Sequence, residues 1–348
     1  MTTRFAFIGL RHPHIFDMYR RCRERNDVDV VASCEEDAVT RDELAKSGTA
    51  TVTHDRYENV LKEIDADVIA VGDCYGRRAG IIVAALRSGK HVISDKPLCI
   101  SLDELDRIEA AAKESGKLVG CMLDMRDLAV FIGMRNLIQE GTVGSVHAIQ
   151  FEGQHPLLYG KRPAWYFEEG MHGGVLNDII VHAVDFIPWA TGLNWRSVVG
   201  ARCWNATVPQ HPHFSQCGQA MLTLDNDAGV ICDVSYLTPD SFAYEFPLYW
   251  RVAVWGSGGV IEAALNSEQI TLYRNGAGEK EPITLPPAVP GGYLDSFLAE
   301  IRGQSKGLRL SSVDALRAAR VSLQIQAIAD EHRTQSALGL EGSTTVFQ

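Results

Sequence analysis

The 348-residue sequence lacks an excess of positive charge, because 33 lysines and arginines stand against 44 aspartates and glutamates. The formal net charge of −11 leaves no general basic face for sequence-independent binding to nucleic acid. No apolar run is long enough for a signal peptide or a membrane span. The eight cysteines include no C-x-x-C pair and do not form a recognisable disulfide framework, which favours a reducing compartment. We therefore expect a cytoplasmic protein with neither a nucleic-acid nor a membrane partner.

Several site motifs are also missing. The sequence contains no P-loop and no serine-centred nucleophile elbow. His12-x-His14 and His211-Pro-His213 could each supply two metal ligands, but no second ligand pair stands at a recognisable spacing. We predict no metal site.

Strands that alternate with helices fill the first third of the chain. We predict strands at residues 4–8, 28–32, 67–71, 91–94 and 118–121, and helices near residues 15–25, 42–46, 80–88 and 102–115. Ser101 is the predicted N-cap of the last helix, with Glu104 in the capping-box position. Alternation at this spacing predicts βαβ units, right-handed crossovers and a buried parallel sheet.

The pattern changes after about residue 121. We predict a helix at residues 130–139, strands at 146–152, 197–203, 219–224, 229–236, 249–255, 260–263 and 269–273, and a helix at 312–330. Turn signals separate these strands, which predicts mostly antiparallel pairing. The chain is therefore expected to divide into an α/β domain at residues 1–121 and a domain with a mixed sheet and helices at residues 122–348.

The turn after the first predicted strand is a candidate phosphate site. Gly9 is the one glycine of the G-x-G-x-x-G fingerprint that remains, and Arg11 and His14 stand where the other two would be. In a nucleotide-binding unit this turn approaches a pyrophosphate at a helix N-terminus, where Arg11, His12 and His14 would add donors. Glu35, at the end of the second predicted strand, could accept hydrogen bonds from ribose hydroxyls, which favours NAD over NADP. An ordinary βα turn and a solvated acid are the alternatives.

Two further strand ends fall on the same side of the predicted sheet. Asp95-Lys96-Pro97 follows the fourth strand, and a lysine there can protonate or polarise a substrate oxygen. Asp73, Tyr75 and Arg78 follow the third strand and could hold an anionic or polyol group. A loop lysine without a catalytic role is the alternative for Lys96.

The densest group of polar residues lies between Gly173 and Asp185. If a helix begins near Asn177, Asp178 and His182 are i,i+4 neighbours on one face. An aspartate beside a histidine orients the imidazole and stabilises its protonated form, which suits a general acid or base. A satisfied His–Asp pair in the core is the alternative. Trp165, shortly before this segment, is a candidate wall of a pocket.

Together these motifs resemble the Gfo/Idh/MocA family of NAD(P)-dependent oxidoreductases nearly end to end. The resemblance is carried by the opening strand with Gly9 and by residues 89–97, 140–146, 173–185, 255–262 and 297–302. It implies an N-terminal Rossmann domain with a doubly wound parallel sheet. It also implies a C-terminal α/β domain with an open, mostly antiparallel sheet that often forms homodimers or homotetramers.

The resemblance implies an activity and a set of site residues. The cofactor would be NAD, with NADP left open, and hydride would pass between it and a secondary hydroxyl of a sugar, inositol or related polyhydroxy compound. Lys96, Asp178 and His182 would be catalytic, with His182 accepting the hydroxyl proton and Lys96 and Asp178 aligning it. The expected cofactor contacts are Gly9, Arg11, His12, His14, Glu35, Asp73, Tyr75, Arg78 and Lys96. The expected substrate contacts are Lys96, Trp165, Asn177, Asp178 and His182.

Departures from the family pattern fall on the cofactor side. Asp73-Cys74-Tyr75 replaces a T-P-N-type turn, Arg78 replaces its closing histidine, and residues 120–125 replace the common G-x-N-x-R-[FY] stretch. Two other hypotheses therefore stay open. One is an NAD-dependent lyase or glycosidase without net redox change, and the other is a non-catalytic member that senses a cofactor or a sugar.

Overall fold

A five-stranded parallel sheet forms the N-terminal part of the computed structural model, which describes residues 2–339 and side chains as far as residue 332. Its strands are β1 (Thr3–Leu10), β2 (Val28–Cys34), β3 (Val68–Gly72), β4 (His91–Asp95) and β5 (Val119–Met122), and its helices are α1 (His14–Glu24), α2 (Ala38–Ser47), α3 (Tyr57–Glu63), α4 (Tyr75–Arg87) and α5 (Leu102–Ser115). The strand order β2-β1-β3-β4-β5 confirms the predicted doubly wound sheet. In such a sheet ligands bind at the carboxyl edge, where the order reverses between β1 and β3.

Local capping explains α5 and was predicted correctly. Ser101 Oγ accepts a hydrogen bond of 3.2 Å from the Glu104 backbone N–H, and the Glu104 carboxylate accepts one of 2.9 Å from Ile100 N–H. Gly116 ends the helix with φ of +66°, a conformation that glycine adopts without strain.

Helix α4 begins at Tyr75, five residues before the predicted start, and α3 was not predicted. The prediction began at Gly80 and rested on the alanine-rich segment that follows it. At Gly76, however, the absence of a side chain lets the helix pack directly against the backbone of Gly170, because a Cβ there would lie 2.0 Å from the Gly170 carbonyl oxygen. The earlier start places Arg78 on a helix rather than in a turn.

An eight-stranded sheet forms most of the rest, in the order β13-β12-β11-β10-β6-β9-β8-β7. Its strands are β6 (Val146–Pro156), β7 (Trp195–Trp204), β8 (Cys217–Leu224), β9 (Gly229–Thr238), β10 (Arg251–Gly256), β11 (Gly259–Ala263), β12 (Gln269–Arg274) and β13 (Lys280–Thr284). Neighbours pair antiparallel except β6 and β9, which are parallel. The predicted open, mostly antiparallel sheet is confirmed, and β13 is an edge strand that was not predicted.

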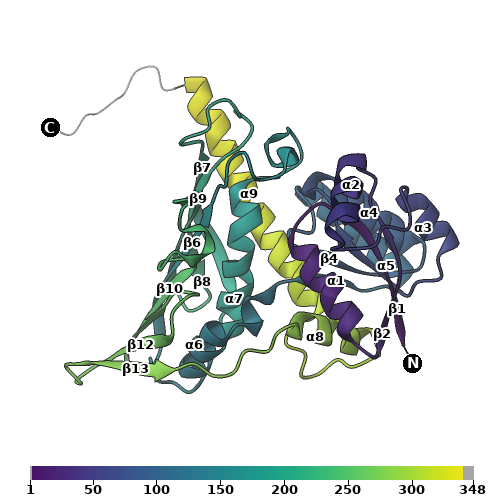
Figure 1. Cartoon of the computed structure of the whole chain (residues 1–348). Helices are drawn as coiled ribbons and strands as arrows, with labels where there is room; N and C mark the ends of the chain where they lie inside the picture. The colour runs from purple at the N-terminus through teal and green to yellow at the C-terminus, as the bar shows by residue number, and fades with distance from the viewer. Residues whose placement is uncertain (1, 340–348) are drawn as a thin grey trace.

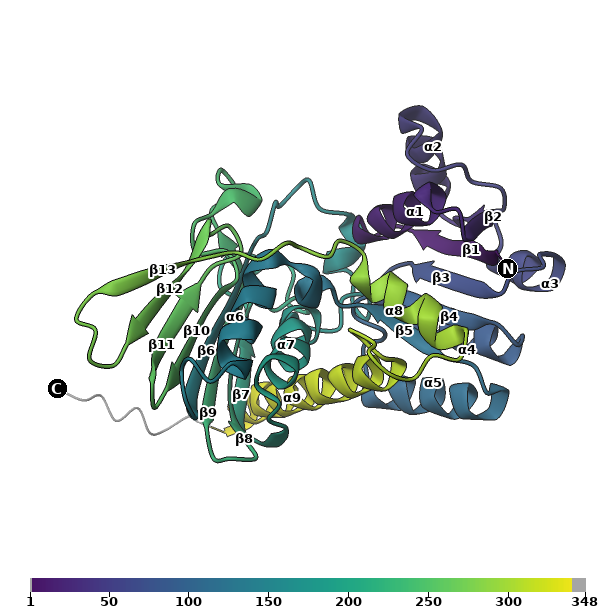
Figure 2. The same ribbon diagram turned by 90° about the horizontal axis from the view of Figure 1, so that it is seen from below.

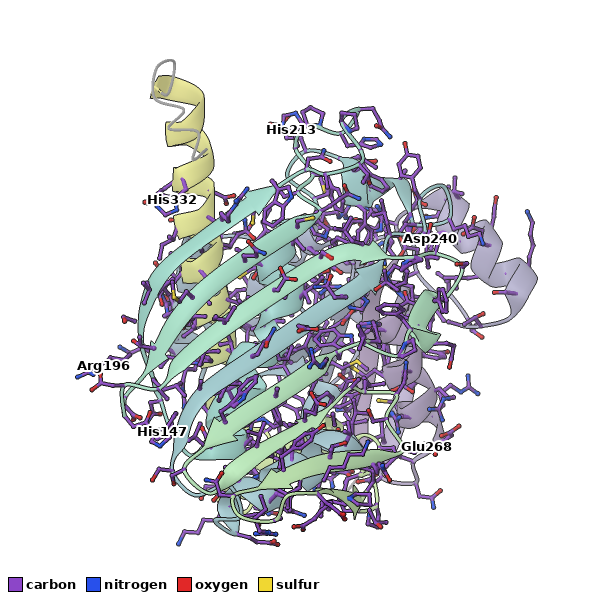
Figure 3. All side chains as sticks on the ribbon, turned by 90° about the vertical axis from the view of Figure 1, so that its left-hand side faces the viewer. His147, Arg196, His213, Asp240, Glu268 and His332 are labelled. Carbon is purple, nitrogen blue, oxygen red and sulfur yellow. The ribbon has the colours of Figure 1, made fainter. Side chains whose placement is uncertain are left out.

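Helices cover one face of this sheet. The remaining helical elements are η1 (Asp124–Asp127), α6 (Ala129–Gln139), η2 (Ala164–Phe167), the π-helical turn η3 (Leu176–Ile180), α7 (Val181–Thr191), η4 (Ala243–Glu245), α8 (Gly292–Ile301) and α9 (Ser312–Gly339). Figures 1 and 2 show α6, α7 and α9 between the eight-stranded sheet and the N-terminal part. Figure 3 shows the other face of the sheet with no helix across it.

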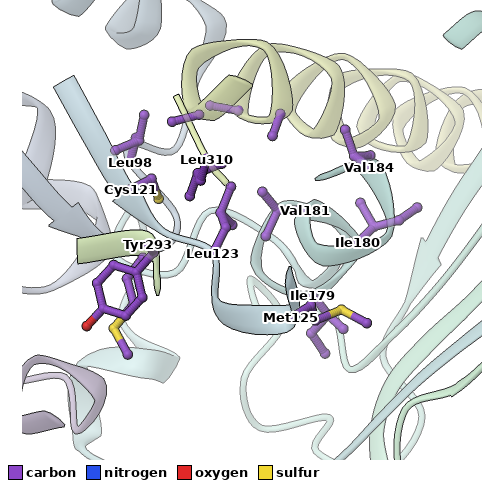
Figure 4. Packing of buried hydrophobic residues seen from close by; sticks show 14 of the residues in the cluster. Leu98, Cys121, Leu123, Met125, Ile179, Ile180, Val181, Val184, Tyr293 and Leu310 are labelled. Carbon is purple, nitrogen blue, oxygen red and sulfur yellow. The ribbon is translucent and has the colours of Figure 1, made fainter. Parts of the chain in front are cut away.

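One hydrophobic core joins the two sheets. Figure 4 shows Cys121 of β5 near Leu310, which precedes α9, with Leu123 and then Val181 of α7 continuing the same cluster. Strand β5 ends at Met122, close to the predicted domain boundary at residue 121. Helices α8 and α9, however, return to the N-terminal part, so the division of the chain into two domains at this residue stays a prediction. No helix within residues 2–339 is both long and apolar enough to cross a membrane.

Candidate active site

Strand ends of the parallel sheet bring three predicted turns together at its carboxyl edge. Gly9 closes β1, Asp73 follows β3, and Lys96 follows β4. Gly9 has φ of +75°, and a Cβ on it would lie 2.4 Å from Asp73 Cβ. Only glycine fits this conformation at this approach, so the first fingerprint glycine has a clear structural reason.

A buried ion pair between Lys96 and Asp178 connects the two halves of the molecule. Lys96 Nζ donates hydrogen bonds of 2.7 Å to Asp178 Oδ1 and 3.0 Å to the Asp178 carbonyl oxygen. Each residue has 2% of its surface exposed. Burial alone would raise the pKa of Asp178, but the charge of Lys96, the neighbouring His172 and the hydrogen bonds from Lys96 and Tyr236 together hold this pKa well below its usual range. The carboxylate is therefore ionised and fixes the ammonium group in place.

Tyr236 of β9 and His172 support the same carboxylate, and neither was predicted. The Tyr236 hydroxyl donates to Asp178 Oδ2 and lies 2.9 Å from His172 Nε2. Because the single hydroxyl proton goes to Asp178, His172 Nε2–H must donate to the Tyr236 oxygen. Burial lowers the pKa of His172 to about 4, so its imidazole is neutral and carries this proton at Nε2.

A second directed chain of hydrogen bonds runs from Asp95 to Tyr166. Burial opposes the charge of Asp95, but His12 and Arg78 hold its pKa well below the usual range, and His12 Nδ1 therefore donates to Asp95 Oδ2. Burial lowers the pKa of His12 to about 3, so its Nε2 accepts from the Tyr75 hydroxyl at 3.0 Å. Tyr75 in turn accepts from Tyr166 at 2.9 Å. The chain fixes the orientation of each of these side chains.

A cavity of about 340 Å³ lies over Lys96 and Asp178. His12 and His14 from the β1–α1 turn also line it, as predicted residues of the site. The other lining side chains were not predicted: His155, Arg162, Tyr166, Tyr236, Tyr244 and Tyr249. The run of aromatic residues around Trp165 and the extension of β6 beyond residue 152 were the sequence signals that could have led to Tyr166, Arg162 and His155.

Three predicted substrate contacts lie outside the lining of this cavity. Asn177 is fully buried, donating to the Cys99 carbonyl at 2.9 Å and accepting from the Ser322 hydroxyl. Trp165 lines a different cavity and packs against Tyr75, with ring centroids 4.9 Å apart. His182 lies edge to face with Trp250 at 4.6 Å, and its buried Nδ1 has no hydrogen-bond partner among the described residues.

The expected pairing of Asp178 with His182 does not form. Both Asp178 oxygens are engaged by Lys96 and Tyr236, and within residues 2–339 no hydrogen bond joins Asp178 to His182. A buried carboxylate is stabilised more by a cation than by a neutral imidazole. Asp178 therefore pairs with Lys96, 82 positions away in the sequence, instead of with His182 on the next helical turn. Asp185, one turn further on, pairs with Arg126 at 2.6 Å.

A larger cavity of about 570 Å³ lies beside the ends of β1 and β2. Leu10, Arg11, Asp37 and Thr40 line it together with Trp165. Arg11 Nε donates to Glu35 at 3.1 Å and lies 3.6 Å from Asp73 Oδ1. The β1–α1 turn therefore lies between two cavities, with Arg11 facing the larger and His14 the smaller.

Glu35 and Arg78 brace the backbone of the turns instead of lining a cavity. Glu35 is fully buried and accepts hydrogen bonds from Leu10 N–H at 2.6 Å, from Arg11 and from Asp37 N–H at 2.8 Å. Arg78 is also fully buried and donates to the Asp73, Asp95 and Pro97 carbonyl oxygens, each at 2.8 Å. Both side chains therefore position the turns that contact a ligand.

His12, His14 and Asp95 form a further group, whose potential metal-ligand atoms all lie within 4.8 Å of one another. Sequence spacing had suggested only the two histidines. The Asp95 carboxylate already accepts from His12 and lies 3.1 Å from the Arg78 guanidinium. This fixed positive charge disfavours a cation at the same carboxylate.

Comparison with known proteins identifies the family. Residues 3–122 match the oxidoreductase family model with an NAD-binding Rossmann fold, and residues 131–262 match the GFO/IDH/MocA C-terminal domain. The chain is 28% identical over 251 residues to mouse glucose-fructose oxidoreductase domain-containing protein 1, covering 69% of this chain and 61% of that protein. It is 33% identical over 137 residues to 1,5-anhydro-D-fructose reductase of Ensifer adhaerens, covering 37% and 38%. The matches thus span less than two thirds of these relatives.

A solved structure agrees over nearly the whole chain. The inositol dehydrogenase homolog of Azotobacter vinelandii, crystallised with NAD⁺, has a TM-score of 0.78 at 17% identity, covering 95% of this chain and 96% of that one. At that identity the likeness shows the fold. The two family models together cover the parallel sheet and most of the eight-stranded sheet, and the chain therefore belongs to the GFO/IDH/MocA family of oxidoreductases, with an NAD-binding Rossmann fold in its N-terminal part.

Proposed function

We propose that this chain transfers hydride between a nicotinamide cofactor and a secondary hydroxyl of a sugar, inositol or related polyhydroxy compound. The observation that carries this proposal is the Lys96–Asp178 pair in the wall of a 340 Å³ cavity at the carboxyl edge of the Rossmann sheet. The names of the relatives, which include a 1,5-anhydro-D-fructose reductase and a D-xylose dehydrogenase, support the substrate class.

The residues present fit a dinucleotide. The turn that begins at Gly9 separates the two cavities, so that each can take one half of an extended dinucleotide. We assign the larger cavity to the adenosine half. Asp37, Glu43 and Glu168 line it, whereas the buried Glu35 does not, and carboxylates there favour a ribose hydroxyl over a 2′-phosphate.

Bound NAD⁺ would supply the hydride acceptor, and the chain supplies the proton chemistry. Lys96 uses two N–H groups on Asp178, which leaves its third N–H for the substrate oxygen, where it stabilises developing negative charge. Asp178, held by Tyr236, keeps Lys96 in position. The substrate hydroxyl and the hydride-donating carbon therefore have to lie within reach of Nζ.

His182 is the proposed acceptor of the hydroxyl proton, by resemblance to the family. Burial and the charge of Lys96 hold its pKa well below the usual range, so its imidazole is neutral and can take up a proton. His155 is the second candidate, because its imidazole lines the cavity and burial likewise holds its pKa well below the usual range. A comparison of His182→Gln with His155→Gln assigns the role.

The experiment is a panel of polyols and sugars with NAD⁺ and NADP⁺, followed by absorbance of the reduced nicotinamide. We expect turnover with NAD⁺, and a loss of about 10²–10⁴-fold in kcat for Lys96→Ala and for the variant of the proton acceptor. Lys113→Ala, at an exposed position of α5, is the matched control. Unchanged rates in Lys96→Ala would overturn the assignment. Turnover without net reduced cofactor would favour a lyase or glycosidase, and ligand binding without turnover would favour a sensing role.

We further propose that the chain acts in the cytoplasm as a homodimer or homotetramer. Buried free thiols at Cys22, Cys34, Cys74 and Cys99 support a reducing compartment. The uncovered face of the eight-stranded sheet carries exposed apolar side chains, among them Val199, Met221 and Ile231, which supports self-association through this face.

A further inference from the structure

Arg162 enters the cavity from the loop between β6 and η2 and is held there rigidly. Its Nε donates to the Leu157 carbonyl at 2.9 Å and its Nη2 to the Pro156 carbonyl at 2.8 Å. The guanidinium also stacks on two tyrosine rings of the cavity wall, 4.7 Å from the centroid of Tyr166 and 5.2 Å from that of Tyr236. These contacts fix the direction of the side chain before any ligand binds.

Among the side chains that the structure describes, none is a counter-ion for the positive charge of Arg162. No carboxylate oxygen of the described chain lies within 4.0 Å of its guanidinium, and Nη1 makes no hydrogen bond to any described residue. The other charges of the wall are balanced, because Lys96 pairs with Asp178, while burial lowers the pKa of His12 to about 3 and keeps His155 neutral as well. The cavity thus carries about one unpaired positive charge inside a protein of net charge −11.

A largely buried cation without a partner is costly, and a ligand that supplies the partner gains strong binding. Two of the five guanidinium N–H donors are occupied by carbonyl oxygens, one on Nε and one on Nη2, so Nη1 is the nitrogen with both of its N–H groups available to a ligand oxygen. One unpaired positive charge matches a monoanionic carboxylate better than a phosphate dianion, which carries up to twice the charge.

We propose that the substrate is a polyhydroxy carboxylate, such as an aldonic or uronic acid, whose carboxylate is bound by Arg162 Nη1 while Lys96 contacts the hydroxyl that reacts. This inference rests on the proposed function, since it adds a second anchor to the same site. Its physical consequence is discrimination: a neutral polyol of the same size leaves Arg162 without a partner, whereas the acid satisfies it.

The proposal is tested with pairs of compounds that share a carbon skeleton and differ in carrying a carboxylate or a terminal hydroxyl. Examples are D-gluconate against D-glucitol and D-galactonate against D-galactitol. We expect kcat/KM to favour the acid by about 10–100-fold, the range of a hydrogen bond to a charged group. Arg162→Met, which keeps the length of the side chain without its charge, should remove most of this ratio. Arg107→Met, at an exposed position of α5, should leave the ratio unchanged.

Binding gives a readout that does not depend on turnover. Calorimetric titration of each aldonate and alditol in the presence of NADH should show the same preference in the wild-type protein and its loss in Arg162→Met. If Arg162→Met does not fold, Arg162→Lys and the wild-type comparison of acid with alcohol still decide the question. The inference would be overturned if the wild-type protein bound and turned over the aldonate and the alditol equally well. It would also be overturned if Arg162→Met kept the wild-type ratio of kcat/KM or of affinity between them.

The outcomes separate this inference from the proposed function. Turnover of alditols and aldonates alike, lost in Lys96→Ala, keeps the function and rejects the carboxylate site. Aldonate binding that depends on Arg162 without turnover of any compound keeps the site and rejects the function. A sugar phosphate that binds better than every aldonate rejects a carboxylate as the ligand group.

Discussion

Folding raises the pKa of Asp127 but lowers the pKa values of the buried histidines, so the two kinds of group change stability with pH in opposite directions. Burial lowers the pKa of His12 to about 3 and that of His172 to about 4, so below about pH 6.5 the unfolded chain takes up protons that the folded chain does not. These groups reduce stability as the pH falls from about 6.5 to about 4. Burial raises the pKa of Asp127 to about 7, so its contribution to stability falls as the pH rises from about 4 to 7.

The variant Asp127→Asn separates the two effects because it mimics the protonated carboxyl at every pH. Relative to wild type, its free energy of unfolding should increase as the pH rises from 4.5 to 7, by up to about 1.4 kcal/mol per pH unit. Urea unfolding at pH 5, 6 and 7 measures this difference. Asp103→Asn, on an exposed carboxylate of α5, should show no such trend. A stability difference between Asp127→Asn and wild type that does not change with pH would contradict the prediction.

Site residues could be predicted from the sequence only where the fold itself determines their position. Gly9 lies next to the last residue of β1 and Lys96 follows β4, and the ends of parallel strands meet at one edge, so their place at this edge followed from the pattern. Arg162 and Tyr236 join Asp178 through contacts between distant segments, and no local periodicity encodes those. The i,i+4 rule paired Asp178 with His182, whereas the structure pairs it with Lys96.

At the scale of elements, the start of α4 is packed against the loop that carries His172. Gly76 N–H donates to the Met171 carbonyl at 3.0 Å, and a Cβ on Gly76 would lie 2.0 Å from the Gly170 oxygen. Because His172 donates to Tyr236, which holds Asp178, this contact connects the Rossmann part to the Lys96–Asp178 pair. A substitution at Gly76 should therefore affect both stability and catalysis.

Gly76→Ala should lower the free energy of unfolding by about 1–3 kcal/mol, the cost of a forced backbone shift, and should reduce kcat. Gly80→Ala is the matched control on the same helix, since nothing lies within 4 Å of the added Cβ. It should raise stability by up to about 1 kcal/mol without changing kcat, because alanine favours the helix. Urea unfolding and steady-state kinetics measure both. Equal effects of the two substitutions would show that the close approach at Gly76 does not matter.

The elements that the sequence predicted well share a clear apolar pattern. Strands β3 and β4 are short apolar runs buried in a parallel sheet, and α5 has both a capping residue and an amphipathic face. Strand β13 reads Lys280-Glu-Pro-Ile-Thr284 and lacks such a pattern, because an edge strand needs pairing on one side only. Its position depends on β12, so the sequence of β13 alone could not indicate it.

For the whole molecule, the uncovered face of the eight-stranded sheet is the surface that most needs an explanation. Met221 and Ile231 are register partners on β8 and β9, with 50% and 56% of their surfaces exposed, and Val199 on β7 is 58% exposed. The helices that could cover a sheet all pack on its other face (Figures 1 and 2). A second copy of the same chain supplies a matching apolar sheet face, and two-fold association is the commonest arrangement for such a surface.

If this face joins two copies, Ile231→Arg should convert the assembly to monomers, because it places an unpaired charge in the centre of a buried apolar contact. Sedimentation equilibrium at micromolar concentration measures the mass, with 38.2 kDa expected for the monomer. Val313→Arg is the matched control, since Val313 is 65% exposed at the start of α9, away from the open face. A monomeric wild-type chain, or dissociation by Val313→Arg but not by Ile231→Arg, would reject the sheet face as the interface. Retained activity in a monomeric Ile231→Arg would further show that the Lys96–Asp178 cavity is complete within one chain.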